Sequence, residues 1–431
     1  MARSRGGLNE REGAWLRAIT YDVRLDTYVL GKAAGQRFPE LYWGPLSGLR
    51  YGEVAAPVRR GDDWALVEVA LAGVCGSDVA AITYKSSPAL TPFTSFPSVL
   101  GHEIVGRVVE AGPGVTHVAA GDRVVVEPFL TCATRGHATA CQACREGTYC
   151  LCHRTADGPL APGMLMGACR DHGGGWAEQV VAHASQLFKL PDELPDELGV
   201  LVEPLSIGVH AVLRRPPAAG ARVLVIGSGM MGFAAVVALR WLAPEAHVTQ
   251  LVQLPYQAAA ARALGADEVI CLAEGGDLTA RVATLTGAAL LRPLHGLGRP
   301  VLVGGYDQVF DCVGSADSLQ DAFYFTKPRG AIVLVGAPGE LPGLDWTFVW
   351  ARELEIVGTL GYGVESWGGE RLRTFDLTLR LMRERPLPLA ALVTHRFALA
   401  DMASALRANV DRGRSRALKT VFDPRMVGGV R

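Results

Sequence analysis

The sequence carries almost no net charge and contains no long run of like charge. Lys and Arg number 42 against 43 Asp and Glu, a formal charge of −1 over 431 residues. Proteins whose main partner is nucleic acid or an anionic membrane surface usually show a marked basic excess. The near-zero net charge argues against nucleic acid and anionic membranes as partners, so we expect the main partner to be a small molecule.

A secretory signal is also missing. Residues 1–15 are polar and charged, and no apolar segment follows them. A secretory leader needs such a segment. The nine cysteines are therefore expected in a reducing compartment, where clustered cysteines indicate metal binding rather than disulfides. We expect a cytoplasmic protein that forms a homo-oligomer.

One apolar stretch approaches the length of a membrane helix. From Val223 to Leu239 no charged residue occurs over 17 positions, whereas a membrane span needs about 18 or more apolar residues. The stretch is interrupted by Gly227, Ser228, Gly229 and Gly232. We interpret it as a buried strand, a glycine-rich turn and a buried helix.

The sequence pattern changes near residue 206. Before this point it consists of short β-branched runs between turn residues, such as Ala65–Ala72 and Gly121–Glu127. After Ala221, strand-like runs alternate with helical stretches. The strand-like runs are Arg222–Ile226, Val248–Val252, Val309–Cys312 and Ala331–Val335, and the helical stretches include Met231–Leu242 and Tyr256–Leu264. This alternation predicts a parallel sheet covered by helices on both faces, and hence an α/β protein.

Four parts are expected along the chain. They are an N-terminal extension (1–14), a β-rich catalytic domain (15–205), a nucleotide-binding domain (206–362) and a C-terminal return to the catalytic domain (363–431). Gly287–Gly305, rich in Leu, Gly and Pro, is expected to be a loop or surface insertion within the third part.

A glycine-rich motif opens the alternating region. Gly227-Ser-Gly-Met-Met-Gly232 follows an apolar strand and begins an Ala/Val-rich helix. Glycines at these positions let the backbone approach a pyrophosphate, and the helix N-terminus supplies free N–H groups. We predict a dinucleotide site formed by Gly227, Gly229, Met231 and Gly232.

The residue that would choose between NAD and NADP is not acidic. Gln253 stands at the end of the second strand-like run, where an Asp or Glu would hydrogen-bond the adenosine ribose and repel a 2′-phosphate. No Arg or Lys stands there either. The choice between NAD and NADP stays open.

Metal-ligating residues occur in three short segments. Cys75 lies in Gly73–Asp78, His102 and Glu103 follow Gly101, and Glu203 begins Glu-Pro-Leu. Thiolate, imidazole and carboxylate are the usual zinc ligands. Asp78 is placed to orient the imidazole as a hydrogen-bond partner. Glu203 could equally be a carboxylate that only favours a helix N-terminus.

Five cysteines crowd between residues 132 and 152. Cys141, Cys144 and Cys152 have spacings close to those of a structural tetrathiolate zinc site. Cys132 and Cys150 compete for the fourth position. We favour Cys132, because Cys150 and Cys152 are only two positions apart and would strain to bind one ion together.

At these residues the chain resembles the zinc-containing alcohol dehydrogenases of the medium-chain dehydrogenase/reductase superfamily. The resemblance runs from about Trp15 to Phe422, and the setting of Glu203 is more similar to the sorbitol, threonine and glucose dehydrogenase branch. The matching segments are Gly73–Asp78, Gly101–Glu103, the cysteine-rich segment 132–152, Gly173–Glu178, Val202–Ser206, Gly227–Gly232, Phe310–Gly314 and Thr394–Phe397.

The resemblance implies a GroES-like catalytic domain, a Rossmann domain, one catalytic and one structural zinc, and an NAD(P)-linked oxidation of a secondary alcohol or polyol. It implies that Cys75 and His102 bind the catalytic zinc, and that Glu103 and Glu203 ligate it directly or hold a water beside it. Ser77 passes the alcohol proton outward, and Asp78 braces the site. The segment Thr359–Gly363 is expected to form part of the nicotinamide wall.

The chain departs from the family pattern near the active site. Ala80 replaces a histidine of the usual proton relay, and the Cys75–His102 spacing is lengthened by Tyr84-Lys85 and a Ser/Pro-rich loop. Two other functions stay open: a zinc-independent quinone or enone reductase of the same fold, and a non-catalytic zinc-binding protein. The sequence does not identify the substrate.

Overall fold

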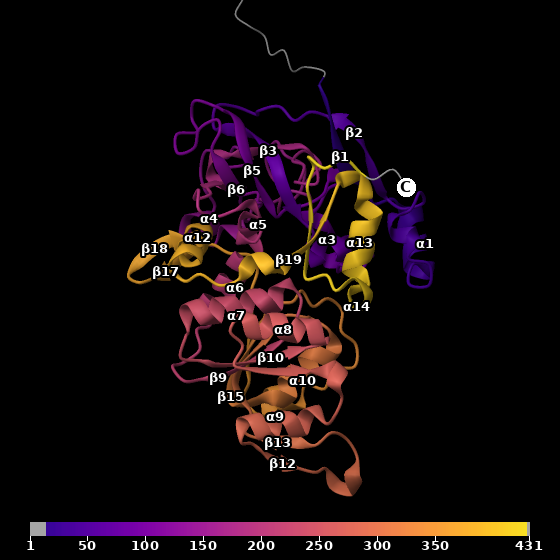
Figure 1. The fold of residues 1–431 in the computed structure, drawn as a ribbon, viewed down its shortest axis with the longest axis vertical. Coiled ribbons are helices and arrows are strands. Elements are labelled where there is room, and N and C mark those ends of the chain that lie inside the picture. Colours follow the sequence, from indigo (N-terminus) through magenta and orange to yellow (C-terminus); the bar gives the residue numbers. More distant parts are fainter. Residues whose placement is uncertain (1–13, 429–431) are drawn as a thin grey trace, which may run out of the picture.

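Two sheet-based domains stack along the long axis of the molecule (Figure 1). This computed structural model describes residues 14–428, so the expected N-terminal extension lies outside the described residues except for Ala14. The upper domain contains most of the first 200 residues and the last part of the chain. The lower domain contains the segment between them.

The upper domain is built on a seven-stranded sheet and a smaller three-stranded one. The larger sheet contains β3 (Trp64–Gly73), β5 (Ile104–Ala111), β6 (Arg123–Val126), β7 (Gln179–His183), β8 (Leu187–Lys189), β19 (Val393–Phe397) and β20 (Lys419–Phe422). The smaller contains β1 (Trp15–Tyr21), β2 (Leu49–Ala55) and β4 (Ser98–Val99). Because β20 pairs antiparallel with β3, matching Val421 with Gly73, the end of the chain lies beside the residues before Cys75.

The lower domain is a six-stranded parallel sheet with the order β11-β10-β9-β14-β15-β16. Its strands are β9 (Arg222–Ile226), β10 (His247–Val252), β11 (Glu268–Cys271), β14 (Tyr306–Asp311), β15 (Thr326–Leu334) and β16 (Glu355–Gly358). Its helices are α7 (Met230–Leu242), α8 (Pro255–Ala263), α9 (Leu278–Thr286), α10 (Ala316–Phe325) and α11 (Thr347–Ala351). The central strands are buried on both faces, which explains why their sequences are largely apolar.

The apolar stretch 223–239 forms β9, a glycine-rich turn and most of α7, as expected. Helix α7 is apolar on nearly every side because it lies between the sheet and α6 (Val202–Arg214). A Cβ on Gly208 would collide with the backbone of Ala234, so the two helices approach closely. Across residues 14–428, no helix combines the length and apolar character needed to cross a bilayer.

Short helices complete the upper domain. They are α1 (Leu25–Ala34), α2 (Glu40–Trp43), α3 (Gly76–Ile82), α4 (Gln142–Glu146), α5 (Asp196–Gly199), α12 (Thr374–Glu384), α13 (Met402–Val410) and α14 (Arg412–Ser415), with the hairpin β17 (Val364–Trp367) and β18 (Glu370–Arg373) before α12. Our interpretation of the first 200 residues as β segments and turns missed the helices among them. In α1 the apolar residues do not form a buried face, since Leu25 is 79% and Val29 56% exposed, so the helical period is weak in the sequence.

The inserted segment Gly287–Gly305 lies at the far end of the lower domain. It forms the two-stranded hairpin β12 (Ala289–Leu291) and β13 (Val301–Val303), which pair antiparallel. The hairpin projects from the domain at the end remote from the upper one (Figure 1). It is the surface insertion that the sequence predicted.

Candidate functional site

A sulfur, a nitrogen and a carboxylate converge where β3 ends. Cys75 immediately precedes α3, and His102 and Glu103 immediately precede β5. One ligand atom from each of the three lies within 4.8 Å of the others. His102 and Glu103 are buried, while Cys75 is half-buried. This set offers the donor types that a zinc ion prefers.

Asp78 fixes the orientation of this group. Its Oδ1 lies 3.4 Å from Nδ1 of His102, and its Oδ2 accepts a hydrogen bond of 2.9 Å from the backbone N–H of Cys75. Burial opposes protonation of the imidazole, but the Asp78 carboxylate and the Cys75 thiolate outweigh it and raise the pKa of His102 well above its usual range. With Nδ1 facing Asp78, Nε2 is the ring nitrogen left for a metal.

Ser77 lies on the same first turn of α3. Its Oγ is 3.4 Å from Nε2 of His102. The hydroxyl is therefore close to any ligand held between the histidine and Cys75. It has the position that a proton-transferring group requires.

Glu103 is paired with a lysine that the sequence analysis did not single out. Lys419, the first residue of β20, forms an ion pair with Oε2 of Glu103, and the two side chains are only 2% and 1% exposed. The ammonium also donates a 3.2 Å hydrogen bond to the carbonyl of Val74. A Cβ on Gly73 would collide with the Glu103 carboxylate, so a larger residue there would displace the carboxylate from its ion pair. The only signal in the sequence is a charged residue at the start of a short strand that ends in Val421 and Phe422.

Glu203 lies on the first turn of α6, but it is not an ordinary exposed helix-start carboxylate. Its side chain is buried, and Oε1 accepts a 3.2 Å hydrogen bond from the Tyr362 hydroxyl. Oε2 is buried without a hydrogen-bond partner within the described residues. Burial raises the pKa of Glu203 to about 7; His102 opposes this shift and the Glu103 carboxylate adds to it. Glu203 therefore interacts electrostatically with His102 and Glu103, but it is not among the residues whose ligand atoms lie within 4.8 Å of one another.

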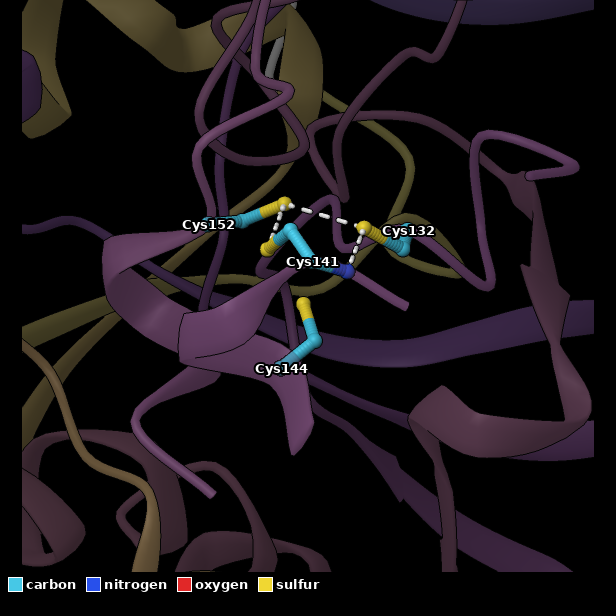
Figure 2. A group of neighbouring side chains, drawn as sticks. All are labelled: Cys132, Cys141, Cys144 and Cys152. Atoms are coloured by element: carbon cyan, nitrogen blue, oxygen red, sulfur yellow. Dashed lines mark hydrogen bonds between the residues drawn. The ribbon is translucent and has the colours of Figure 1, made fainter. Parts of the chain in front are cut away.

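Four cysteines form a second group, shown in Figure 2. The sulfurs of Cys132, Cys141, Cys144 and Cys152 all lie within 4.8 Å of one another, and the Cys132–Cys152 and Cys141–Cys152 separations are 3.7 and 3.9 Å. Zinc–sulfur bonds of about 2.3 Å in a tetrahedron require sulfur separations of about 3.8 Å. The arrangement fits one zinc ion with no open position, which is the form of a structural site.

Cys150 is directed away from this cluster. It lies on the short helical turn Tyr149–Leu151, and its Sγ donates to the carbonyl of Leu360 at 3.1 Å. Burial raises the pKa of Cys150 to about 11. Between the two competitors for the fourth position, the structure places Cys132 in the cluster.

The glycine-rich turn has the form of a phosphate cradle. Gly227 has φ of 118°, which favours glycine, and a Cβ on Gly232 would collide with the carbonyl oxygen of Gly227. Gly229 caps α7, so the N–H groups of its first turn, including those of Met231 and Gly232, have no partners within the helix. Gln250 donates a 2.9 Å hydrogen bond to the carbonyl of Gly227 and steadies the turn. The free N–H groups and the space kept by glycine fit a dinucleotide pyrophosphate.

Gln253 follows the last residue of β10 and is exposed. Its backbone N–H donates to Ser228 Oγ at 3.3 Å, and Ser228 donates to Gln257 at 2.8 Å. The side chain itself is free to face a bound nucleotide or solvent.

Segment 359–363 contacts Glu203 and Cys150, which lie next to the two groups of metal-ligating residues. Tyr362 contacts Glu203, and the carbonyl of Leu360 accepts from Cys150. The rings of Tyr362 and Phe129 meet edge to face at 5.3 Å. Through Tyr362 and Glu203, the segment is linked to the group formed by Cys75, His102 and Glu103.

Comparison with known proteins agrees with this arrangement. The alcohol dehydrogenase GroES-like domain model matches residues 61–192, and the zinc-binding dehydrogenase model matches residues 231–375. The chain is 31% identical to L-idonate 5-dehydrogenase of Vitis vinifera over 83% of its length and 87% of that protein. It is 30% identical to sorbitol dehydrogenase of Arabidopsis thaliana, over 83% of this chain and 87% of the relative. The structure of 2R,3R-butanediol dehydrogenase from Bacillus subtilis superposes with a TM-score of 0.70 at 24% identity, covering 95% of this chain and 99% of the other.

Proposed function

Because the chain belongs to the zinc-containing alcohol dehydrogenase family, we propose that Cys75, His102 and Glu103 form its catalytic metal site and that its substrate is a polyol oxidised at a secondary carbinol. The family membership makes the protein a zinc-dependent, NAD(P)-linked oxidoreductase of alcohols or polyols. The observation that carries the residue assignment is the convergence of the three ligand atoms within 4.8 Å.

Zinc supplies a Lewis acid that lowers the pKa of a hydroxyl, and NAD(P) supplies a hydride acceptor. The residues of this chain provide placement and proton transfer. Asp78 holds the His102 ring with Nε2 toward the metal position. Ser77 accepts the hydroxyl proton at Oγ and passes it toward the cofactor ribose or water, a route that does not use the histidine absent at Ala80.

Two carboxylates and a buried lysine balance the charge of this site. A thiolate at Cys75 and the Glu103 carboxylate offset the two charges of a zinc ion. Glu203 adds another negative charge, and Lys419 supplies a matching positive one. In this arrangement Glu203, steadied by Tyr362, accepts a hydrogen bond from a substrate hydroxyl or a water. Glu203 thereby gives the site a second polar anchor, which suits a polyol better than a simple alcohol.

A substrate screen tests this proposal. Zinc-loaded protein is incubated with sorbitol, L-idonate and 2-propanol, each with NAD and NADP, and formation of the reduced nicotinamide is followed by absorbance. We expect turnover with a polyol or sugar acid, weaker turnover with 2-propanol, and loss of activity on chelation. Activity that survives complete zinc removal would instead indicate a zinc-independent reductase.

Replacing Lys419 by Met should destabilise the metal-free protein. The substitution leaves the Glu103 carboxylate buried without its counter-charge, and breaking a buried ion pair in this way costs on the order of 3–5 kcal/mol. Denaturant unfolding measures the change. Lys189→Met is the matched control, because Lys189 is 57% exposed and pairs with Asp122 at the surface, where an ion pair contributes about 0–1 kcal/mol. Equal effects of the two variants would show that the Lys419–Glu103 pair has no special role.

Replacing Gln253 by Asp should move cofactor preference toward NAD. A carboxylate at this position can accept hydrogen bonds from the ribose hydroxyls but repels a 2′-phosphate, and like charges about 4 Å apart cost a few kcal/mol, or about tenfold or more in relative kcat/KM. Gln253→Asn is the neutral control and should leave the ratio unchanged. If the NAD/NADP ratio of Gln253→Asp stays within about twofold of wild type, the ribose is held elsewhere.

A further inference from the structure

A basic segment of the upper domain lies against the nucleotide-binding edge of the lower one. Helix α14 follows α13, and Figure 1 shows it at the end of α13 nearest the lower domain. Tyr256, on the first turn of α8, donates its hydroxyl to the carbonyls of Arg412 and Ala417 at 3.2 and 3.4 Å. The C-terminal return is therefore fixed beside the strand end at Gln253.

Arg412 reaches the glycine-rich turn. A methyl group built on Gly229, the N-cap of α7, would lie 3.3 Å from Nη1 of Arg412. The guanidinium is half-buried, and its Nε donates to the carbonyl of Asn409 at 3.2 Å. The pKa of Arg412 is lowered because burial partly removes its charged guanidinium from water. Over residues 14–428 it has no ion-pair partner.

Arg416 also lies next to Tyr256. Its guanidinium carbon is 5.8 Å from the centroid of the tyrosine ring, and it too has no ion-pair partner in the described part of the chain. The one acidic residue of the segment, Asp411, accepts the N–H of Arg414 at 3.3 Å and caps α14. Residues 253–257 contain no acidic residue. The start of α8 therefore carries no negative charge of its own and lies beside positive charge that has no ion-pair partner. Glu274 follows Ala273, whose backbone N–H donates to the Gln253 carbonyl at 3.1 Å. The Glu274 carboxylate is paired with Arg281 at 3.7 Å.

Given the proposed function, on which this inference rests, we infer that the chain prefers NADP and that Arg416 recognises the 2′-phosphate, with Arg412 neutralising the diphosphate. The adenosine ribose of a dinucleotide lies beyond the end of the second strand of a Rossmann sheet. Here that strand is β10, and Tyr256 begins the helix that follows it. Recognition of the 2′-phosphate thus comes from the catalytic domain rather than from the residue at position 253. This explains how the chain dispenses with a basic residue there.

Direct binding of nucleotides to the zinc-loaded protein tests the inference without relying on turnover. Dissociation constants for NADPH and NADH are measured by nucleotide fluorescence, and those for 2′,5′-ADP and 5′-AMP by calorimetry. We expect wild type to bind NADPH and 2′,5′-ADP about tenfold or more tightly than their counterparts, because a charge-assisted contact to phosphate is worth 1.5–3 kcal/mol.

Three single variants separate the roles. Arg416→Ala should weaken NADPH by about tenfold and leave NADH within about twofold. Arg412→Ala should weaken both nucleotides by the same factor. Arg414→Ala is the matched control, an exposed arginine of the same helix, and should change neither. The melting temperature of each variant checks that the fold is retained.

Wild type that binds NADH as tightly as NADPH would overturn the inference, even if zinc content and polyol oxidation are as proposed. Equal weakening of both nucleotides by Arg416→Ala would also overturn it. A protein that binds neither nucleotide would instead contradict the proposed function itself. The two failures are therefore distinguishable.

Discussion

Cys75→Ser should abolish turnover and release one of two zinc ions while the protein stays folded. The thiolate is one of the three ligands proposed for the catalytic zinc, with His102 and Glu103, and a serine hydroxyl is a far weaker zinc ligand. Loss of a Lewis acid removes several kcal/mol of transition-state stabilisation, so kcat/KM should fall about 10³-fold or more. Zinc per chain, measured by mass spectrometry of the metal, should fall from two to one.

The fold should survive because Cys75 is half-buried and lies two residues after β3, outside the paired strands of the sheet. Cys169→Ser is the matched control. Cys169 is buried outside both metal groups and donates to the carbonyl of Ala161 at 3.3 Å, a bond that a hydroxyl can also make. It should keep two zinc ions and normal turnover. Release of both ions by Cys75→Ser would show that the two sites are assigned wrongly.

The parallel sheet could be predicted from the sequence because its strands are buried on both faces. Strand β10 and helix α7 begin and end within one residue of the expected positions, since a mainly apolar strand and a continuously apolar helix start leave a clear pattern. Helix α1 gave no such pattern. Its apolar residues Leu25 and Val29 face outward, so neither the helical nor the strand period applied.

Parts of a site that lie close together in the sequence could also be predicted. Cys75, Ser77 and Asp78 share one helical turn, so their proximity follows from their spacing. The pairing of Glu103 with Lys419 and that of Glu203 with Tyr362 could not be predicted, because each joins residues far apart in the chain. Both pairings depend on how β20 and the segment after β16 return to the upper domain. That path through space leaves no local pattern in the sequence.

The identity of the fourth cysteine in the Cys141, Cys144 and Cys152 group could be decided only from the backbone geometry. Spacing left Cys132 and Cys150 as alternatives. The short helical turn Tyr149–Leu151 decides between them, because it turns the Cys150 sulfur toward Leu360. That orientation also supplies the control for the test of the structural zinc site.

Cys144→Ser should remove the structural zinc and destabilise the upper domain strongly. In a closed four-sulfur site the binding free energy of the metal is part of the folding free energy, roughly 10–16 kcal/mol for isolated zinc peptides. Losing one of four ligands should cost at least about 4 kcal/mol, which corresponds to a melting temperature lower by roughly 10 °C or more for a domain of this size. Calorimetric melting and zinc content measure the two effects together.

Cys150→Ser is the matched control from the same segment. Its sulfur lies outside the cluster, and a serine hydroxyl can keep the hydrogen bond to Leu360, so zinc content should stay at two and the melting temperature should change little. If Cys150→Ser released the metal and Cys132→Ser did not, the fourth ligand would be Cys150. If Cys144→Ser left both melting temperature and zinc content unchanged, the four cysteines would be packed thiols, and the stability of the lobe would come from its burial alone. We expect Cys144→Ser to lose the structural zinc and Cys150→Ser to keep it, because the sulfur separations of 3.7 and 3.9 Å that Cys152 makes with Cys132 and Cys141 match a tetrahedron around one zinc ion.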